Sequence, residues 1–252
     1  MTQTFEIAVI GATGTVGETL VQILEELDFP VGTLYLLAGS NSAGASVPFR
    51  GKNVRVREVD EFDFSKAQLA FFAAGPAVTL SFAPRATAAG CSVIDLSGAL
   101  PADQAPQVVP EANAHVLDGL KKPFQLSSPS PCATHLAVVL APLRGLLDIQ
   151  RVSVTANLAV SAQGREAVSE LARQTAELLN VRPLEPQFFD RQMAFNLLAQ
   201  VGKPDAQGHT ELEKRLIHEL RAVLETPLLK ISATCVQAPV FFGDSLTVSL
   251  QL

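Results

Sequence analysis

The sequence has few cysteines and few charged residues. Charged residues make up 17% of the 252 positions, and there are three cysteines. Cys91, Cys132 and Cys235 are odd in number and far apart, so they do not predict a disulfide framework. This usage is typical of a reducing compartment, and we therefore expect a cytoplasmic protein.

Long apolar runs and clustered basic residues are also missing. There is no stretch of about 18 uninterrupted apolar residues, so no membrane span is expected. Residues 1–6 contain no basic segment, which predicts that no signal peptide is present. The net charge of −6 gives no electrostatic basis for binding nucleic acid. Neither His209 nor His218 has partners at metal-ligand spacing, so no metal site is predicted.

What the sequence does contain is enough apolar material, 48% of its residues, for one large or two ordinary domains. In the first hundred residues, short apolar runs alternate with stretches of helical periodicity. This order predicts βαβ units and a doubly wound parallel sheet of the Rossmann type. The expected strands are 7–10, 34–37, 69–73 and 93–94, and the expected helices follow strand 7–10 and cover 77–89.

The character of the chain changes near residue 131. Five prolines between 101 and 129 predict irregular chain with short strands around Val108 and Phe124. Beyond them we expect a helix from Cys132 to about residue 147, kinked by Pro142, and helices over 165–179 and 211–224. Apolar residues alternate from Val152 to Val160, which is typical of an antiparallel strand with one buried face, and 229–252 is rich in strand signals. The predicted domains are therefore 1–131, a dinucleotide-binding domain, and 132–252, an α+β domain.

A glycine-rich segment joins the first strand to the first helix. Glycines allow a sharp turn and a close approach to a pyrophosphate, while the helix N-terminus offers free N–H groups and a positive dipole end. A tight turn without a ligand is the alternative. The predicted cofactor contacts are Gly11, Thr13, Gly14, Thr15, Val16 and Gly17.

The choice between NAD and NADP stays open at this point. A carboxylate after the second strand would bind the ribose 2′-hydroxyl of NAD, and an arginine would accept the 2′-phosphate of NADP. The second strand is followed by Gly39, Ser40, Asn41 and Ser42, which include neither group.

Several segments along the chain together form a recognisable set of motifs. In order, they are Val9–Gly17, Leu36–Gly44, Phe71–Gly75, Val93–Ser97, Val108–Asn113, Ala194–Asn196 and Pro239–Gly243. In this order and spacing they resemble the aspartate-semialdehyde dehydrogenase family. The resemblance implies a Rossmann domain, a catalytic and dimerisation domain, a homodimer, and reduction of an acyl phosphate by NADPH through a thioester on Cys132. It also implies cofactor contacts at Asn41 and Gly75, and a chain that continues beyond Leu252.

The chain departs from the family's pattern at the catalytic positions. The Asn-Pro-Asn that precedes the cysteine is Pro129-Ser130-Pro131 here. The pattern resembles the Usg-type paralogues of the family, which share the scaffold without the active-site set. The remaining replacements are Asp244 for the acid/base histidine, Gln237 for the substrate-binding arginine, Leu158 for the glutamine beside the thioester, Pro101 for the phosphate-binding arginine, and Asn41 for the arginine near the 2′-phosphate.

These replacements leave Cys132 open to two interpretations. Its place at a helix start would lower the pKa of a nucleophilic thiol, but Asp244 would raise that pKa by like-charge repulsion. The cysteine is therefore either a nucleophile activated by another group or a buried structural residue. Three functions follow: a paralogue that binds a nucleotide and a metabolite without the parent reaction, an NAD(P)-dependent oxidoreductase on a changed substrate, or a non-enzymatic dimeric regulator.

Overall fold

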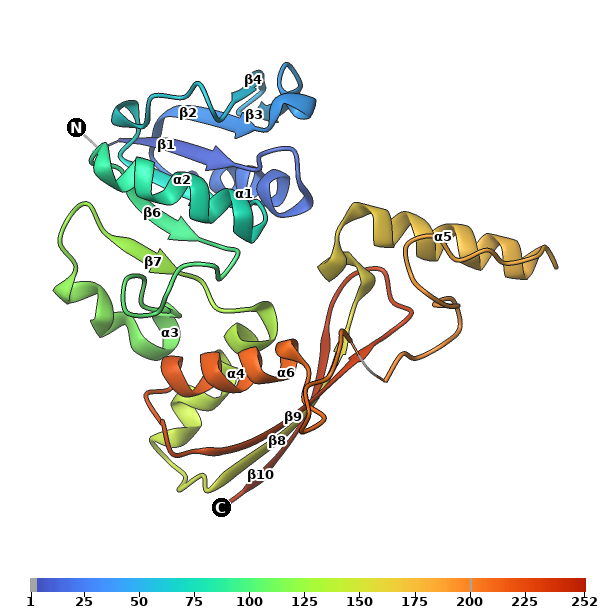
Figure 1. Ribbon diagram of the computed structural model, residues 1–252. Helices are drawn as coiled ribbons and strands as arrows, with labels where there is room; N and C mark the ends of the chain where they lie inside the picture. Colours follow the sequence, from blue (N-terminus) through green and yellow to red (C-terminus); the bar gives the residue numbers. More distant parts are fainter. Residues whose placement is uncertain (1–3, 200) are drawn as a thin grey trace. The chain divides into compact units, whose positions relative to one another are not determined.

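A computed structural model describes residues 4–199 and 201–252 (Figure 1). The chain divides into two compact units, Met1–Pro129 and Ser130–Leu252. The domain bounds inferred from the sequence, 1–131 and 132–252, stay a prediction. No helix in the described part of the chain is long and apolar enough to cross a membrane.

Within the described residues, the first unit is built on a seven-stranded sheet with the order β3-β4-β2-β1-β5-β6-β7. All neighbouring strands are parallel except β3, which pairs with β4 in an antiparallel hairpin. The strands are β1 (Phe5–Ile10), β2 (Val31–Ala38), β3 (Ser46–Phe49), β4 (Lys52–Glu58), β5 (Leu69–Phe72), β6 (Ser92–Asp95) and β7 (Gln125–Ser127).

Helices cover both faces of this sheet. Helix α1 (Thr15–Glu26) contributes Val21 and Leu24 to a core cluster that includes Val9 and Leu36. Helix α2 (Pro76–Ala88) contributes Phe82 to a second cluster, which includes Ile10. Because successive strand residues point to opposite faces, these two clusters lie on opposite sides of the sheet. The predicted doubly wound parallel sheet is confirmed.

The proline-rich segment contains more helix than predicted. Pro110 begins the short helix α3 (Pro110–Asn113), and a 3₁₀ helix, Ala114–Gly119, follows it. The strand expected around Val108 is wrong, because the chain there makes one isolated bridge, between Gln107 and Ser127. Proline at a first helical turn loses no hydrogen bond, which explains why Pro110 starts a helix rather than ending regular structure.

The second unit, within the described residues, has a three-stranded sheet with the order β10-β8-β9. Strand β8 pairs antiparallel with β10 and parallel with β9, so the expected antiparallel sheet is mixed. Helix α6 packs on β9, and α4 packs beside α6 (Figure 1). The elements are α4 (Pro131–Arg144), β8 (Arg151–Leu158), α5 (Arg165–Leu179), α6 (Glu211–Val223), β9 (Lys230–Gln237) and β10 (Ser245–Gln251).

Most predicted elements of this unit occur where the periodicity placed them. Helix α5 spans the predicted range, and β8 shows the predicted alternation of buried and exposed residues. Helix α4 ends at Arg144, earlier than predicted, with Pro142 in its last turn. Gly145, a poor helix former, follows as the C-cap of α4.

Candidate functional site

The glycine loop between β1 and α1 is closely packed against its own unit. Gly11 has a φ of +83°, and a Cβ there would lie 2.8 Å from the carbonyl oxygen of Ala73. A Cβ at Gly17 would lie 2.2 Å from the Gly11 oxygen. Both positions therefore require glycine so that strand, loop and helix can approach each other.

Gly14 differs from Gly11 and Gly17 because a Cβ built there would have only one close neighbour. Its nearest neighbour would be the Gly11 oxygen at 3.3 Å, and its backbone is extended, with φ of −80°. Gly14 is the N-cap of α1 and provides no side-chain cap, while Thr15 and Val16 are exposed and Thr13 is half-buried. The first N–H groups of α1 therefore form the kind of donor set that binds a pyrophosphate.

Two other predicted contacts lie at the same sheet edge. Gly75 is the N-cap of α2, and no atom lies within 4 Å of a Cβ built on it. Asn41 is exposed in the 3₁₀ turn Ser40–Ser42 that follows β2. Because β2, β1 and β5 are parallel neighbours, the loops that leave their carboxyl ends meet at one edge.

In the second unit, the thiol of Cys132 is enclosed. Cys132 lies in the first turn of α4 with 6% of its surface exposed. Its Sγ donates a hydrogen bond to Oδ2 of Asp244 over 3.6 Å. Burial, and next the negative charge of Asp244, raise the pKa of the thiol to about 12. The thiol is therefore protonated at neutral pH.

Asp244 is held in place by its second oxygen. Oδ1 accepts the N–H of Ala159 over 2.8 Å, which ties the chain before β10 to the end of β8. Gly243, just before it, has a φ of +87°, a region where glycine is unstrained. The carboxylate thus has a structural role besides its contact with the thiol.

Gln237 is engaged by neutral partners. It is 2% exposed at the end of β9. Its Nε2 donates to the carbonyl of Leu158 over 2.7 Å, and its Oε1 accepts from Nε2 of Gln163 over 2.5 Å. An uncharged amide bound in this way offers no cation to a substrate carboxylate.

The structure brings together part of the set expected from the sequence. Direct contacts link Cys132 to Asp244, and Gln237 to the backbone of Leu158. Pro101 is exposed and belongs to the first unit.

Sequence reasoning missed the roles of Gln163 and of two acidic residues in α6. Glu219 is 1% exposed, and its Oε2 accepts the N–H of Ser130, the N-cap of α4, over 2.9 Å. Glu213 completes a capping box with Thr210 and accepts the N–H of Cys235. The face of α6 that carries these two carboxylates is therefore buried. The capping-box spacing was the sequence signal that could have revealed Glu213.

Residues 6–120 match the family model described as semialdehyde dehydrogenase, NAD binding domain, and residues 140–252 match its dimerisation domain. These matches identify the unit with the glycine loop as a nicotinamide nucleotide-binding domain.

Similar proteins span the whole chain. A USG-1 protein homolog of Azotobacter vinelandii is 58% identical, over all of this chain and 75% of the relative. A solved structure described as a probable aspartate-semialdehyde dehydrogenase from Pseudomonas aeruginosa is 56% identical, with a TM-score of 0.96 over 99% of this chain and 75% of that one. Aspartate-semialdehyde dehydrogenase II from Vibrio cholerae is 37% identical, with a TM-score of 0.95 and the same coverage. The resemblance seen in the sequence is thereby confirmed, and this chain belongs to the aspartate-semialdehyde dehydrogenase family.

Proposed function

We propose that this protein is a nucleotide-binding homodimer that does not perform the family's acyl-phosphate reduction through Cys132. The observation that carries this proposal is the contact between the Cys132 thiol and the Asp244 carboxylate. It occurs in a chain whose nucleotide domain keeps the features of its family.

The backbone of residues 11–17 would hold the pyrophosphate of NAD or NADP. The uncapped N-terminus of α1 supplies donors, and the open surface at Gly75 admits the dinucleotide. When bound, a nicotinamide nucleotide donates or accepts a hydride. The packing of Gly11 against Ala73 supports a loop shaped for close backbone approach.

The thiol is poorly suited to nucleophilic attack. A thiolate is the reactive form, and with a pKa of about 12 roughly one thiol in a hundred thousand is ionised at pH 7. The carboxylate of Asp244 opposes ionisation, whereas an imidazolium in the same place would favour it. Family catalysis through this cysteine is therefore expected to be slow.

The residues at the expected substrate-binding positions are also poorly suited to the family's reaction. Gln237 presents a neutral amide that is already bonded to Gln163 and to the Leu158 carbonyl. Leu158 is an apolar side chain that cannot donate a hydrogen bond to an acyl oxygen. Loss of charged and polar positioning groups typically lowers rates by factors of about a hundred each, although such losses do not multiply fully within one catalytic unit.

We propose that the dimer forms through the face of the β10-β8-β9 sheet opposite to its buried residues. Val152, Val154 and Ala156 of β8 are buried, so the intervening residues point the other way. Three adjacent rows on that face contain no charged residue. The rows are Ser249–Ser153–Ser232, Thr247–Thr155–Thr234 and Ser245–Asn157–Val236.

A second copy of this face is a suitable partner for it. Homodimers form through the same patch on both subunits, and the centres of such patches are depleted of charge. The match of residues 140–252 to a dimerisation domain supports this assignment.

The experiment combines binding and turnover on the purified chain. Titration with NADH and NADPH, followed by nicotinamide fluorescence, should detect binding at or below millimolar concentration. With NAD or with NADP, formation of the reduced nucleotide from aspartate semialdehyde and phosphate should be at least several orders of magnitude slower than for the Vibrio cholerae enzyme run in parallel. Failure of both nucleotides to bind, or turnover comparable to that enzyme, would refute the proposal.

A further inference from the structure

The end of β2 carries no group that distinguishes the two nicotinamide nucleotides. In dinucleotide-binding folds, a carboxylate there binds the ribose 2′-hydroxyl of NAD, and an arginine accepts the 2′-phosphate of NADP. Strand β2 ends at Ala38 and continues into Gly39, Ser40 and Asn41, which provide neither. The discriminating group must therefore come from a neighbouring element.

Strand β4 places a carboxylate beside this position. It is parallel to β2, and Glu58 is aligned with Ala38. The N–H of Val59 donates to the Ala38 carbonyl over 2.9 Å, which fixes this register at the carboxyl edge. Adjacent strands lie about 4.8 Å apart, a distance that a glutamate side chain spans.

Glu58 lies on the side of the sheet that faces the glycine loop's helix. Val56, two residues before it, belongs to the core cluster that contains Val21 and Leu24 of α1. Because side chains alternate along a strand, Glu58 follows Val56 on the α1 face, whereas Arg57 is on the opposite face. The N-terminus of α1 is the expected pyrophosphate site, so the adenosine ribose falls on the same side as Glu58.

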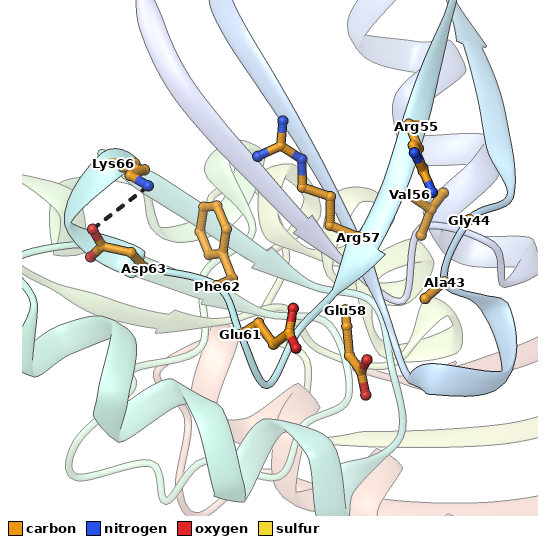
Figure 2. A pocket seen from close by; sticks show the side chains of 10 residues that line it. All are labelled: Ala43, Gly44, Arg55, Val56, Arg57, Glu58, Glu61, Phe62, Asp63 and Lys66. Carbon is orange, nitrogen blue, oxygen red and sulfur yellow. Dashed lines mark ion pairs between the residues drawn. The ribbon is translucent and has the colours of Figure 1, made fainter.

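The cavity at the end of β4 carries charges of both signs. Its volume is about 510 Å³, and its charged lining consists of Glu58, Glu61 and Asp63 with Arg55, Arg57 and Lys66. Arg55 and Arg57 alternate with Glu58 along β4 and therefore lie on the other face of the strand. In Figure 2, Glu58 lies at the carboxyl end of the strand and Arg57 extends in the opposite direction. Lys66, on another wall, is paired with Asp63 at 3.9 Å. Within the described residues, no hydrogen bond or ion pair engages the Glu58 carboxylate.

We infer that Glu58 makes this protein selective for NAD over NADP. Its carboxylate accepts a hydrogen bond from the ribose 2′-hydroxyl and repels a 2′-phosphate, which carries between one and two negative charges at pH 7. Asn41 provides no compensating cation. This inference rests on the nucleotide binding proposed above. Repulsion between charges a few ångströms apart at a protein surface is large enough for a preference of about tenfold or more.

The test is a pair of equilibrium titrations of the whole chain with NADH and NADPH, by fluorescence and by calorimetry. The wild-type Kd for NADH should be lower by about tenfold or more. Glu58→Gln keeps the size of the side chain but removes its charge, so the two Kd values should converge, chiefly through tighter NADPH binding. Glu25→Gln, an exposed change in the last turns of α1, is the matched control and should leave the ratio unchanged.

A variant designed to prefer NADPH provides a second test of the role of Glu58. The double variant Asn41→Arg, Glu58→Gln should bind NADPH more tightly than NADH. Wild-type binding of NADPH at equal or higher affinity would overturn the inference while leaving nucleotide binding intact, and so would an unchanged ratio in Glu58→Gln. Binding of neither nucleotide would overturn the proposed function and this inference together.

Discussion

The Cys132 thiol and the Asp244 carboxylate, 112 positions apart in the chain, are joined by a 3.6 Å hydrogen bond in which the thiol is the donor. In this arrangement the thiol is stabilised by remaining protonated. A cysteine at a helix start would otherwise gain acidity from the helix dipole. Because the thiol is the donor, the contact favours the protonated, unreactive cysteine. Asp244, in the place of the family's histidine, therefore opposes nucleophilic attack by Cys132.

Removing the charge of Asp244 should make the cysteine more reactive. In Asp244→Asn, the amide oxygen still accepts the Ala159 N–H, but the repulsion that opposes the thiolate is lost. We expect alkylation of Cys132 by iodoacetamide at pH 8 to accelerate about tenfold. Site-resolved mass spectrometry measures this rate, with Cys91, whose pKa is raised by burial alone, as the internal control whose rate should not change. Equal rates for Cys132 in both proteins would contradict the proposed influence of Asp244.

The buried thiols should make stability fall in alkaline solution. Burial raises the pKa of Cys91 and of Cys235 from 9.0 to about 11, and that of Cys132 to about 12. Above pH 9 the unfolded chain therefore loses thiol protons that the folded chain keeps. The stabilisation is complete below pH 9 and is lost as pH rises towards the folded-state pKa values, by up to about 1.4 kcal/mol per pH unit for each thiol.

Urea unfolding at pH 8, 9 and 10 measures this effect. The control is a variant with all three cysteines replaced by alanine, which should have a lower stability at pH 8 but a shallower dependence on pH. Identical slopes in the two proteins would exclude the thiols as the cause.

Nucleotide binding should depend on Gly14 while folding does not. A Cβ at Gly14 approaches the Gly11 oxygen to 3.3 Å, a contact that a small shift relieves, so Gly14→Val should remain folded. Its side chain would occupy the surface that the pyrophosphate needs, and we expect binding to be abolished in the fluorescence titration. Gly119→Val, at an exposed glycine with open space around it, is the control and should bind normally. Undiminished binding by Gly14→Val would place the nucleotide elsewhere.

Restoring the family's reaction should require more than its histidine. Asp244→His alone should stay inactive, because Gln237 and Pro101 still provide no cation for the substrate. Adding Gln237→Arg, Leu158→Gln and Pro101→Arg should yield measurable formation of NADH or NADPH from aspartate semialdehyde, phosphate and the oxidised nucleotide. Activity in the single variant would mean that the substrate is held by other residues.

A charge introduced at the centre of the proposed dimer face of the β10-β8-β9 sheet should prevent dimerisation. Thr155 is exposed in the middle row of that face, between Thr247 and Thr234. In Thr155→Arg, two copies of the new charge would meet across a two-fold axis, and we expect light scattering to report a monomer. Thr19→Arg, on the exposed side of α1, should leave the mass unchanged. A dimeric Thr155→Arg protein would assign the interface to another surface.

The sequence was most informative where periodicity and glycine spacing act locally. Strand β1, the loop from Gly11 to Gly17 and helices α2, α5 and α6 follow from patterns within a few residues. The β3–β4 hairpin was not predicted, although its side chains alternate, with Pro48, Arg55 and Arg57 at exposed positions. Each of these strands has only two inward apolar residues, which is a weak signal in the sequence.

Long-range polar contacts could not be derived from spacing. Ser130 and Glu219 are 89 positions apart, and no local signal indicates that the carboxylate will accept the N–H at the start of α4. The proximity of Cys132 to Asp244 was expected because the family resemblance aligns them with a catalytic pair. The hydrogen bond between Gln163 and Gln237 depends on tertiary packing and had no signal in the sequence.

Glu219 has a further effect on the first turn of α4. Acyl transfer at a cysteine develops a negative oxygen, which enzymes stabilise with backbone N–H groups aimed at it. Here the N–H of Ser130 is already bonded to the carboxylate of Glu219, and a second carboxylate, that of Asp244, faces the thiol. We therefore expect an oxyanion formed at this turn to meet the negative charge of two carboxylates, which would disfavour the tetrahedral intermediate as well as the nucleophile that would form it.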